Sequence, residues 1–122
     1  MTWVGNWQNQ FGSILRITGD AEGRIDGNFE TALEDSGFYG QTVPIIGFHK
    51  GNCIGFVAVG SSAAGDRVVS YTGLLRHGKM ETVWFVVADQ ALSAAREGDP
   101  AKLKPLNWWR AVTTNVDTFE RI

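Results

Sequence analysis

The chain has 122 residues, which is the length of one domain, so we expect residues 1–122 to form a single folding unit. With 43% hydrophobic residues and only 3 prolines, it is neither disordered nor collagen-like. A net charge of −2 without a basic run argues against a nucleic-acid partner, and no apolar run reaches the roughly 18 residues of a membrane helix. The first residues show no basic and apolar leader, which favours a cytoplasmic protein or a mature secreted form whose leader has been removed.

Segments typical of strands alternate with turn signals along the whole chain, at the spacing found in all-β folds. We predict strands at residues 3–8, 13–18, 24–31, 39–48, 53–59, 68–76, 81–87 and 108–120. Most are joined by short polar or glycine-containing turns, which favour antiparallel neighbours. The sequence therefore predicts an all-β fold, an eight-stranded antiparallel up-and-down β-barrel with room for one small ligand.

The connection from Ala88 to Asn107 breaks this pattern. Loops of about twenty residues are uncommon in compact domains unless they are functional or carry structure of their own. Residues 89–98 are predicted to form a short helix, with Asp89 as its N-cap and Gly98 as its C-terminal stop. We therefore expect a long, partly helical loop between the seventh and eighth strands.

Residues that support catalysis or bind metals are sparse in this sequence. His49 and His77 are both predicted in surface turns, and no group of His, Cys and carboxylates has the short spacing of a metal site. Cys53 is the only cysteine, so no internal disulfide forms, and its apolar neighbours predict a small buried hydrophobe. We therefore predict neither enzymatic activity nor a cofactor.

Two motifs near the chain ends are specific when they are taken together. The stretch GNWQNQFGS at residues 5–13 resembles the Gly-x-Trp-x-Asn-Gln-x-Gly-Ser opening of the avidin and streptavidin family. At the other end, Trp109 stands eight residues before Asp117, which begins an Asp-x-Phe element similar to that family's ending. The middle of the chain aligns through residues 27–31, 71–73 and 83–84.

The resemblance implies a barrel that binds biotin at one end. A ureido group offers one carbonyl acceptor and two N–H donors. By position, Asn9 and Ser13 would donate to the ureido oxygen, while Asp117 and Thr31 would accept from the two N–H groups. Trp84 would form an apolar wall of the pocket beside the ring system of biotin.

The resemblance also implies self-association. Family members form dimers or tetramers, and Trp109 matches a Trp that reaches from one subunit into the pocket of its neighbour. We therefore expect biotin or a related small molecule and a second copy of the chain, in a homodimer or homotetramer, as partners.

The chain departs from the family pattern at several pocket positions. Phe29 stands where the family has a Tyr donor, and both Gly60 and Tyr71 stand where it has Trp. Arg67 aligns near a hydroxyl residue that meets the biotin carboxylate, and an Arg can pair with a carboxylate bidentately. Asp35 falls near the same carboxylate and would repel it. We therefore expect an altered, weaker affinity.

Other functions remain open at the level of sequence. The loss of an aromatic wall at Gly60 and the long loop favour, as an alternative, an interaction or structural module that has lost tight biotin binding. A carrier for long apolar ligands is less favoured, and an enzyme least, since fold alone does not settle function.

Overall fold

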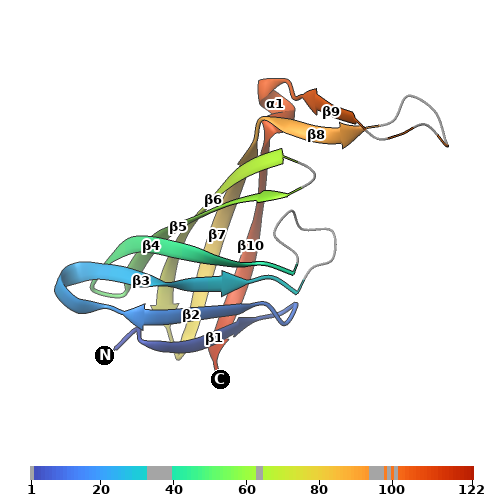
Figure 1. Cartoon of the computed structure of the whole chain (residues 1–122). Coiled ribbons are helices and arrows are strands. Elements are labelled where there is room, and N and C mark those ends of the chain that lie inside the picture. Colours follow the sequence, from blue (N-terminus) through green and yellow to red (C-terminus); the bar gives the residue numbers. More distant parts are fainter. Residues whose placement is uncertain (1, 33–39, 63–64, 94–97, 99, 101) are drawn as a thin grey trace.

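The computed structural model describes residues 2–32, 40–62, 65–93, 98, 100 and 102–122. The barrel strands are β1 (Gly5–Asn9), β2 (Ile14–Gly19), β3 (Arg24–Glu30), β4 (Thr42–Lys50), β5 (Cys53–Ser62), β6 (Gly65–Arg76), β7 (Lys79–Ala88) and β10 (Val112–Arg121). They form a closed antiparallel barrel in the order β1-β10-β7-β6-β5-β4-β3-β2 (Figure 1). The predicted eight-stranded up-and-down barrel is therefore confirmed.

The long connection after β7 folds differently from the prediction. Gln90–Ser93 form β8, which pairs antiparallel with β9 (Lys102–Pro105) and places Leu92 opposite Leu103. The helix predicted over residues 89–98 is therefore wrong for its described part. A short isolated helix is marginal in water, whereas a hairpin pairs the backbone groups of both its strands.

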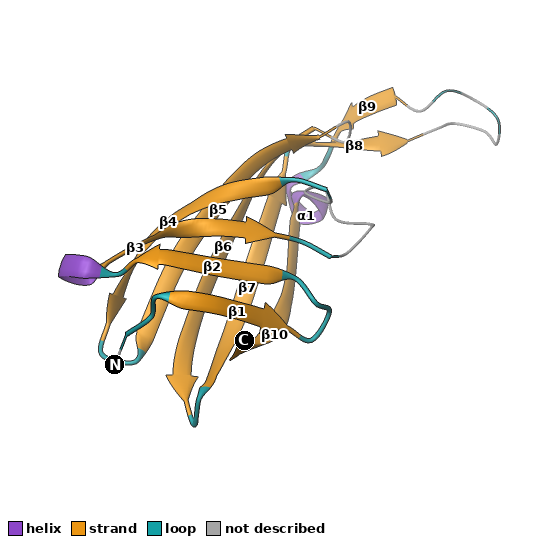
Figure 2. Cartoon of the chain, turned by 60° about the horizontal axis from the view of Figure 1, so that its bottom comes forward, coloured by secondary structure: helices purple, strands orange, loops and turns teal. Residues whose placement is uncertain are grey.

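The predicted start of the last strand is also corrected. Trp108–Ala111 form the short helix α1, and β10 begins only at Val112 (Figure 2). The N–H groups of Arg110 and Ala111 donate to the carbonyl oxygen of Asn107 at 2.8 and 2.9 Å. These two bonds and the burial of Ala111 hold the turn in helical form. The only other helical segment among the described residues is the 3₁₀ turn η1 (Ala21–Gly23) between β2 and β3.

Alternation along the strands divides the barrel side chains into an inner and an outer set. On β7, Met80 and Thr82 are buried, whereas Glu81 and Val83 are exposed. Near the end of the barrel that carries the chain termini, the inner set is apolar and buried: Trp7, Ile17, Ile25, Ile54, Leu75, Met80 and Phe119. Each such side chain stabilises the fold by about 1.5–3 kcal/mol. A packed core therefore closes this end.

The same alternation corrects two smaller predictions. Cys53 is exposed rather than buried, because its neighbour Ile54 takes the inner position. His49 lies within β4 and not in a turn; its Nε2 is 2.8 Å from the carbonyl oxygen of Asp20. His77 does lie in a turn, between β6 and β7. No helix in the described part of the chain has the length and apolar character needed to cross a membrane.

Candidate functional site

The barrel end opposite the chain termini admits solvent to its interior. Arg67, Trp84 and Val86 occupy inner positions there but are only half-buried. Asn115, paired with Trp84 in the β7–β10 register, is exposed. The β1–β2 connection lies at this end (Figure 1). The barrel interior is therefore partly exposed to solvent at this end.

Buried polar side chains gather just inside this opening. The buried polar residues of the described chain are Asn9, Ser13, Thr31, Thr82 and Asp117. Asn9 donates from Nδ2 to Oδ2 of Asp117 at 3.2 Å, and the hydroxyls of Ser13 and Thr31 are 3.4 Å apart. The structure thus brings together the four polar residues that the sequence analysis singled out.

The β1–β2 turn orients Asn9. Its Oδ1 accepts the N–H groups of Phe11 at 3.0 Å and Ser13 at 2.9 Å, so the amide nitrogen faces Asp117. Gly12 adopts a φ of 89°, which a side chain rarely allows, and so permits the tight turn. The side-chain oxygen of Asn9 is therefore fully used by the turn, while its amide nitrogen keeps one N–H for another acceptor.

Asp117 is held by neutral donors. Besides Asn9, Nε2 of Gln10 donates to its Oδ1 at 3.3 Å, and Oγ1 of Thr82 donates to its backbone carbonyl at 3.0 Å. Neither ion pair of the described residues involves Asp117. A buried carboxylate without a cation favours further N–H donors, because hydrogen bonds to a charged group are stronger than neutral ones.

Gln10 and Thr82 were not predicted as site residues. Gln10 lies inside the GNWQNQFGS motif, so its place in the motif could have identified it. Its Oε1 also accepts the N–H of Thr118 at 3.0 Å. Thr82 directly precedes the aligned residues 83–84 but is not part of that match. Only the β7–β10 register, which pairs it with Asp117, identifies it.

Aromatic rings pack below and beside the polar cluster. Tyr71 stacks on Phe56 with ring centroids 4.7 Å apart and contacts Phe29 at 5.9 Å and Phe119 at 6.3 Å. Burial raises the pKa of Tyr71, and the negative charge of Asp117 raises it further. The Tyr71 phenol is therefore a neutral group close to the carboxylate.

The remaining predicted site residues lie in different surroundings. Trp84 neighbours Tyr71 in the sheet, and Gly60 faces Arg67 across the β5–β6 pair. Trp109 lies on α1, 70% exposed and outside the cluster, with the Arg110 guanidinium 4.7 Å from its ring centroid. Asp35 lies outside the described residues. No cluster of His, Cys, Asp and Glu able to hold a metal ion occurs within the described segments.

Comparisons with known proteins agree with this architecture. The model of the avidin family matches residues 1–122. A search of curated proteins found no match. Among solved structures, the bradavidin2–biotin complex is 19% identical, with coverage of 100% of this chain and 99% of that chain and a TM-score of 0.73.

Two further solved structures are similar. The rhizavidin–biotin complex is 20% identical, with coverage of 99% and 92% and a TM-score of 0.73. Apo shwanavidin is 21% identical, with coverage of 98% and 95% and a TM-score of 0.71. At these identities the likeness to solved structures concerns the fold.

Proposed function

The chain belongs to the avidin family, and we propose that it binds biotin, or a biotin-like ureido compound, at the open end of the barrel without catalysing a reaction. The observation that carries this proposal is the buried cluster of Asn9, Ser13, Thr31 and Asp117 just inside the opening. Its donors and its carboxylate complement a ureido group, which has one acceptor and two donors.

Each polar contact follows from the hydrogen bonds already present. Asn9 retains an N–H for the ureido oxygen, because its Oδ1 serves the turn. Oγ of Ser13 accepts the N–H of Ala32 at 2.9 Å, so its proton can be donated to the same oxygen. Asp117 accepts one ureido N–H in a charge-assisted bond, and the Thr31 hydroxyl accepts the other.

The apolar part of the ligand is stabilised by the aromatic side chains. Phe29 and Tyr71 are buried beside the cluster, and half-buried Trp84 borders the opening. Phe29 carries no hydroxyl, which removes one donor to the ureido oxygen. A lost bond of this kind costs about 1–3 kcal/mol, or roughly one to two powers of ten in affinity. We therefore propose that this chain binds biotin more weakly than a family member that has a Tyr hydroxyl at the position of Phe29.

Thermal unfolding and calorimetric titration with biotin test this function. Binding to the folded state alone raises the melting temperature by mass action. Biotin is expected to raise the melting temperature and to release heat at one site per chain. Pentanoic acid, which lacks the ureido ring, is the control ligand. Neither heat nor a thermal shift at millimolar biotin would contradict the proposal.

We also propose that the chain forms a homodimer or homotetramer through an outer apolar face. This face comprises the exposed residues Ile46, Phe48, Val57, Val59, Val68, Val83, Phe85, Val87 and Val116. It is continuous, because the sheet registers pair Ile46 with Val57, Val59 with Val68, Val68 with Val87 and Val83 with Val116. A groove of about 460 Å³, lined in part by Ile46, Phe48 and Val57, lies within it.

A second copy of the same face is the occupant that fits best. The side chains of this face are uncharged, and large exposed apolar patches mark interaction sites.

The exposed Trp109 supports the further proposal that it reaches the ligand site of a neighbouring subunit. Trp109→Ala is then expected to weaken biotin binding and the assembly together; a variant that changes neither refutes the cross-subunit role.

Light scattering after size exclusion tests the assembly. Phe85→Glu places a charge in the outer apolar face and is expected to yield monomers. Asn6→Glu adds the same charge at an exposed position of β1 and is expected to leave the mass unchanged. A wild-type chain with the mass of a monomer at micromolar concentration would contradict the proposal.

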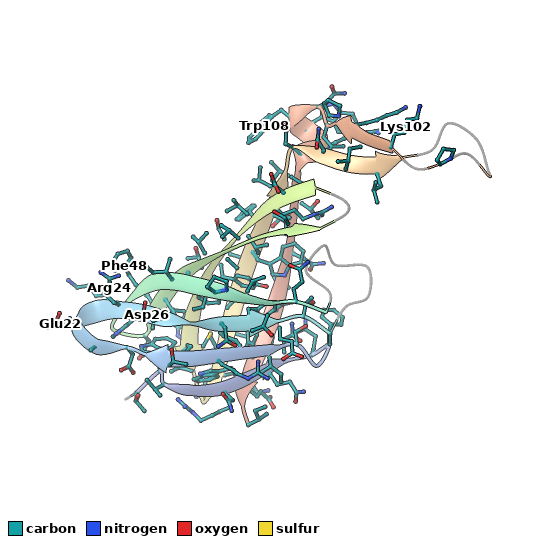
Figure 3. All side chains as sticks on the ribbon, in the orientation of Figure 1. Glu22, Arg24, Asp26, Phe48, Lys102 and Trp108 are labelled. Atoms are coloured by element: carbon teal, nitrogen blue, oxygen red, sulfur yellow. The ribbon has the colours of Figure 1, made fainter. Side chains whose placement is uncertain are left out.

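A second candidate is an interaction module that has lost tight biotin binding. The β8–β9 hairpin favours it, because it projects beyond the barrel and exposes Leu92 and Leu103 (Figure 1). Figure 3 shows Lys102 and Trp108 in this region, far from Glu22 and Arg24 at the other end. Deleting residues 91–103 distinguishes the candidates: lost partner binding with unchanged biotin binding favours the module.

A further inference from the structure

Tyr71 brings a buried hydroxyl group to the inner side of the barrel. Only 6% of the residue is exposed, and its hydroxyl has no hydrogen-bond partner among the described residues. The rings packed against it belong to Phe56, Phe29 and Phe119, at centroid distances of 4.7, 5.9 and 6.3 Å, and a phenyl ring carries no oxygen or nitrogen acceptor. A buried donor without an acceptor is costly, which indicates that a ligand atom accepts this bond.

The Tyr71 hydroxyl remains a donor over the pH range in which the protein would meet a ligand. Burial raises the pKa of the phenol, and the negative charge of Asp117 raises it further. The carboxylate itself does not accept the phenol proton in this structure, because its two oxygens accept from Asn9 and Gln10. The proton of Tyr71 is therefore available to a bound molecule.

The ureido group of the proposed ligand has no acceptor left for this hydroxyl. Its carbonyl oxygen has two lone pairs, and Asn9 and Ser13 are placed to donate to both. Its two N–H groups are donors, which the proposed function assigns to Asp117 and Thr31. Tyr71 therefore needs an acceptor in another part of the ligand.

The sheet register places Tyr71 beyond the ureido site, toward the opening. Asp117 and Gly73 both pair with Thr82, and in the next inner row Tyr71 pairs with Trp84. One such row corresponds to two residues, or roughly 7 Å of strand. In a fused bicycle such as biotin, a second ring adjoins the ureido ring. The heteroatom of that second ring is the acceptor that can meet the Tyr71 hydroxyl.

On the basis of the proposed function, we propose that the Tyr71 hydroxyl donates to the heteroatom in the second ring of the ligand and makes the site selective for an oxygen at that atom. A thioether sulfur is only a weak acceptor, whereas an ether oxygen accepts a phenol proton readily. Trp84, the neighbour of Tyr71 in its row, has an indole N–H that only donates, so it cannot accept the proton instead. The class of ligand is therefore a ureido bicycle whose second ring contains oxygen.

Calorimetric titration with three ligands of the same shape tests the proposal. They carry sulfur, oxygen or a methylene group at one ring position: biotin, oxybiotin and the carbocyclic analogue. The wild type is expected to bind oxybiotin most tightly and the carbocyclic analogue least, with affinities about tenfold apart. Tyr71→Phe removes the hydroxyl and keeps the ring. It is expected to lose this preference, so that oxybiotin binds no more tightly than the carbocyclic analogue.

Thr72→Val is the matched control. It removes the hydroxyl of the next residue along β6, which is exposed on the outer side of the barrel, and is expected to keep the wild-type preference. Melting temperatures without ligand verify that each variant folds. The order of the three ligands on the wild type tests the inference even if Tyr71→Phe does not fold.

Two outcomes would overturn the inference and leave biotin binding in place. One is a wild type that binds oxybiotin no more tightly than the carbocyclic analogue. The other is a Tyr71→Phe variant that weakens the binding of all three ligands by the same factor, which would assign the hydroxyl to the ureido group. If none of the three ligands binds the wild type, the proposed function itself fails, and the inference fails with it.

Discussion

Nδ2 of Asn9 lies 3.2 Å from Oδ2 of Asp117, although 108 positions separate the two residues in the sequence. The contact exists because the barrel closes between β1 and β10, the first and last strands. Gln10 also links the first strand to the last, since it binds both the carboxylate of Asp117 and the N–H of Thr118. Closure of the barrel therefore brings Asp117 to the residues that the β1–β2 turn already holds together.

Asp117→Asn is expected to weaken biotin binding by roughly ten- to a hundredfold, because a neutral amide cannot accept a charge-assisted bond. Calorimetric titration measures the change. Asp26→Asn, at an exposed position of β3, is the control for loss of one negative charge and should bind as the wild type does. Equal affinities of the wild type and Asp117→Asn would exclude the carboxylate from the binding site.

Ser13→Ala is expected to lower the free energy of unfolding by about 1–3 kcal/mol, because it leaves a backbone donor without its acceptor. Oγ of Ser13 accepts the N–H of Ala32 at 2.9 Å, and Ser13 itself is buried. Urea unfolding without ligand measures the loss. Ser70→Ala, on the outer side of β6, is the matched control and should stay within about 0.5 kcal/mol of the wild type.

Tyr71 is expected to resist ionisation in the folded protein. Burial first, and then the charge of Asp117, raise its pKa above the ordinary value of 10.0. The stability that the protonated phenol contributes is therefore present below about pH 10 and is lost as the pH rises further. Ultraviolet titration of the Tyr39→Phe variant, which retains Tyr71 as its only tyrosine, measures this pKa.

The part that Asp117 plays in this shift has its own test. Adding Asp117→Asn to the Tyr39→Phe variant is expected to lower the pKa of Tyr71, because it removes the second cause of the shift. Tyr71→Phe is expected to reduce the loss of stability at alkaline pH. An unchanged titration of Tyr71 in the Asp117→Asn background would show that the two groups do not interact.

Asp20 is expected to stabilise the N-terminal segment in a pH-dependent way. Its Oδ2 accepts hydrogen bonds from the Thr2 hydroxyl at 2.8 Å and the Trp3 N–H at 2.7 Å, and these lower the pKa of the carboxyl. Because the folded-state pKa is depressed, the stabilisation is present above the ordinary value of 3.8 and disappears as the pH falls through the folded value. The stability gap between the wild type and Asp20→Asn, measured by urea unfolding, should therefore close in acid; a gap that is constant with pH would contradict this.

Much of the fold was predictable from local patterns. Strand-forming segments punctuated by short turns predicted eight barrel strands in the right order, and seven of them begin and end within a few residues of the prediction. The motif at residues 5–13 also located Asn9 and Ser13, because a tight turn brings its two flanking residues together whatever the rest of the chain does.

The sequence by itself therefore determined the strand segments and their antiparallel order, since turn chemistry acts over a few residues, and its resemblance to the avidin family indicated Asn9, Ser13, Thr31 and Asp117. Tertiary structure alone decided the features that depend on distant strands. Residues 90–93 became a strand because Lys102–Pro105 pair with them, and Thr82 joined the cluster through the β7–β10 register. Arg67 acquired its inner position between Gly60 and Ala88 because the registers of the β5–β6 and β6–β7 pairs set its cross-strand neighbours.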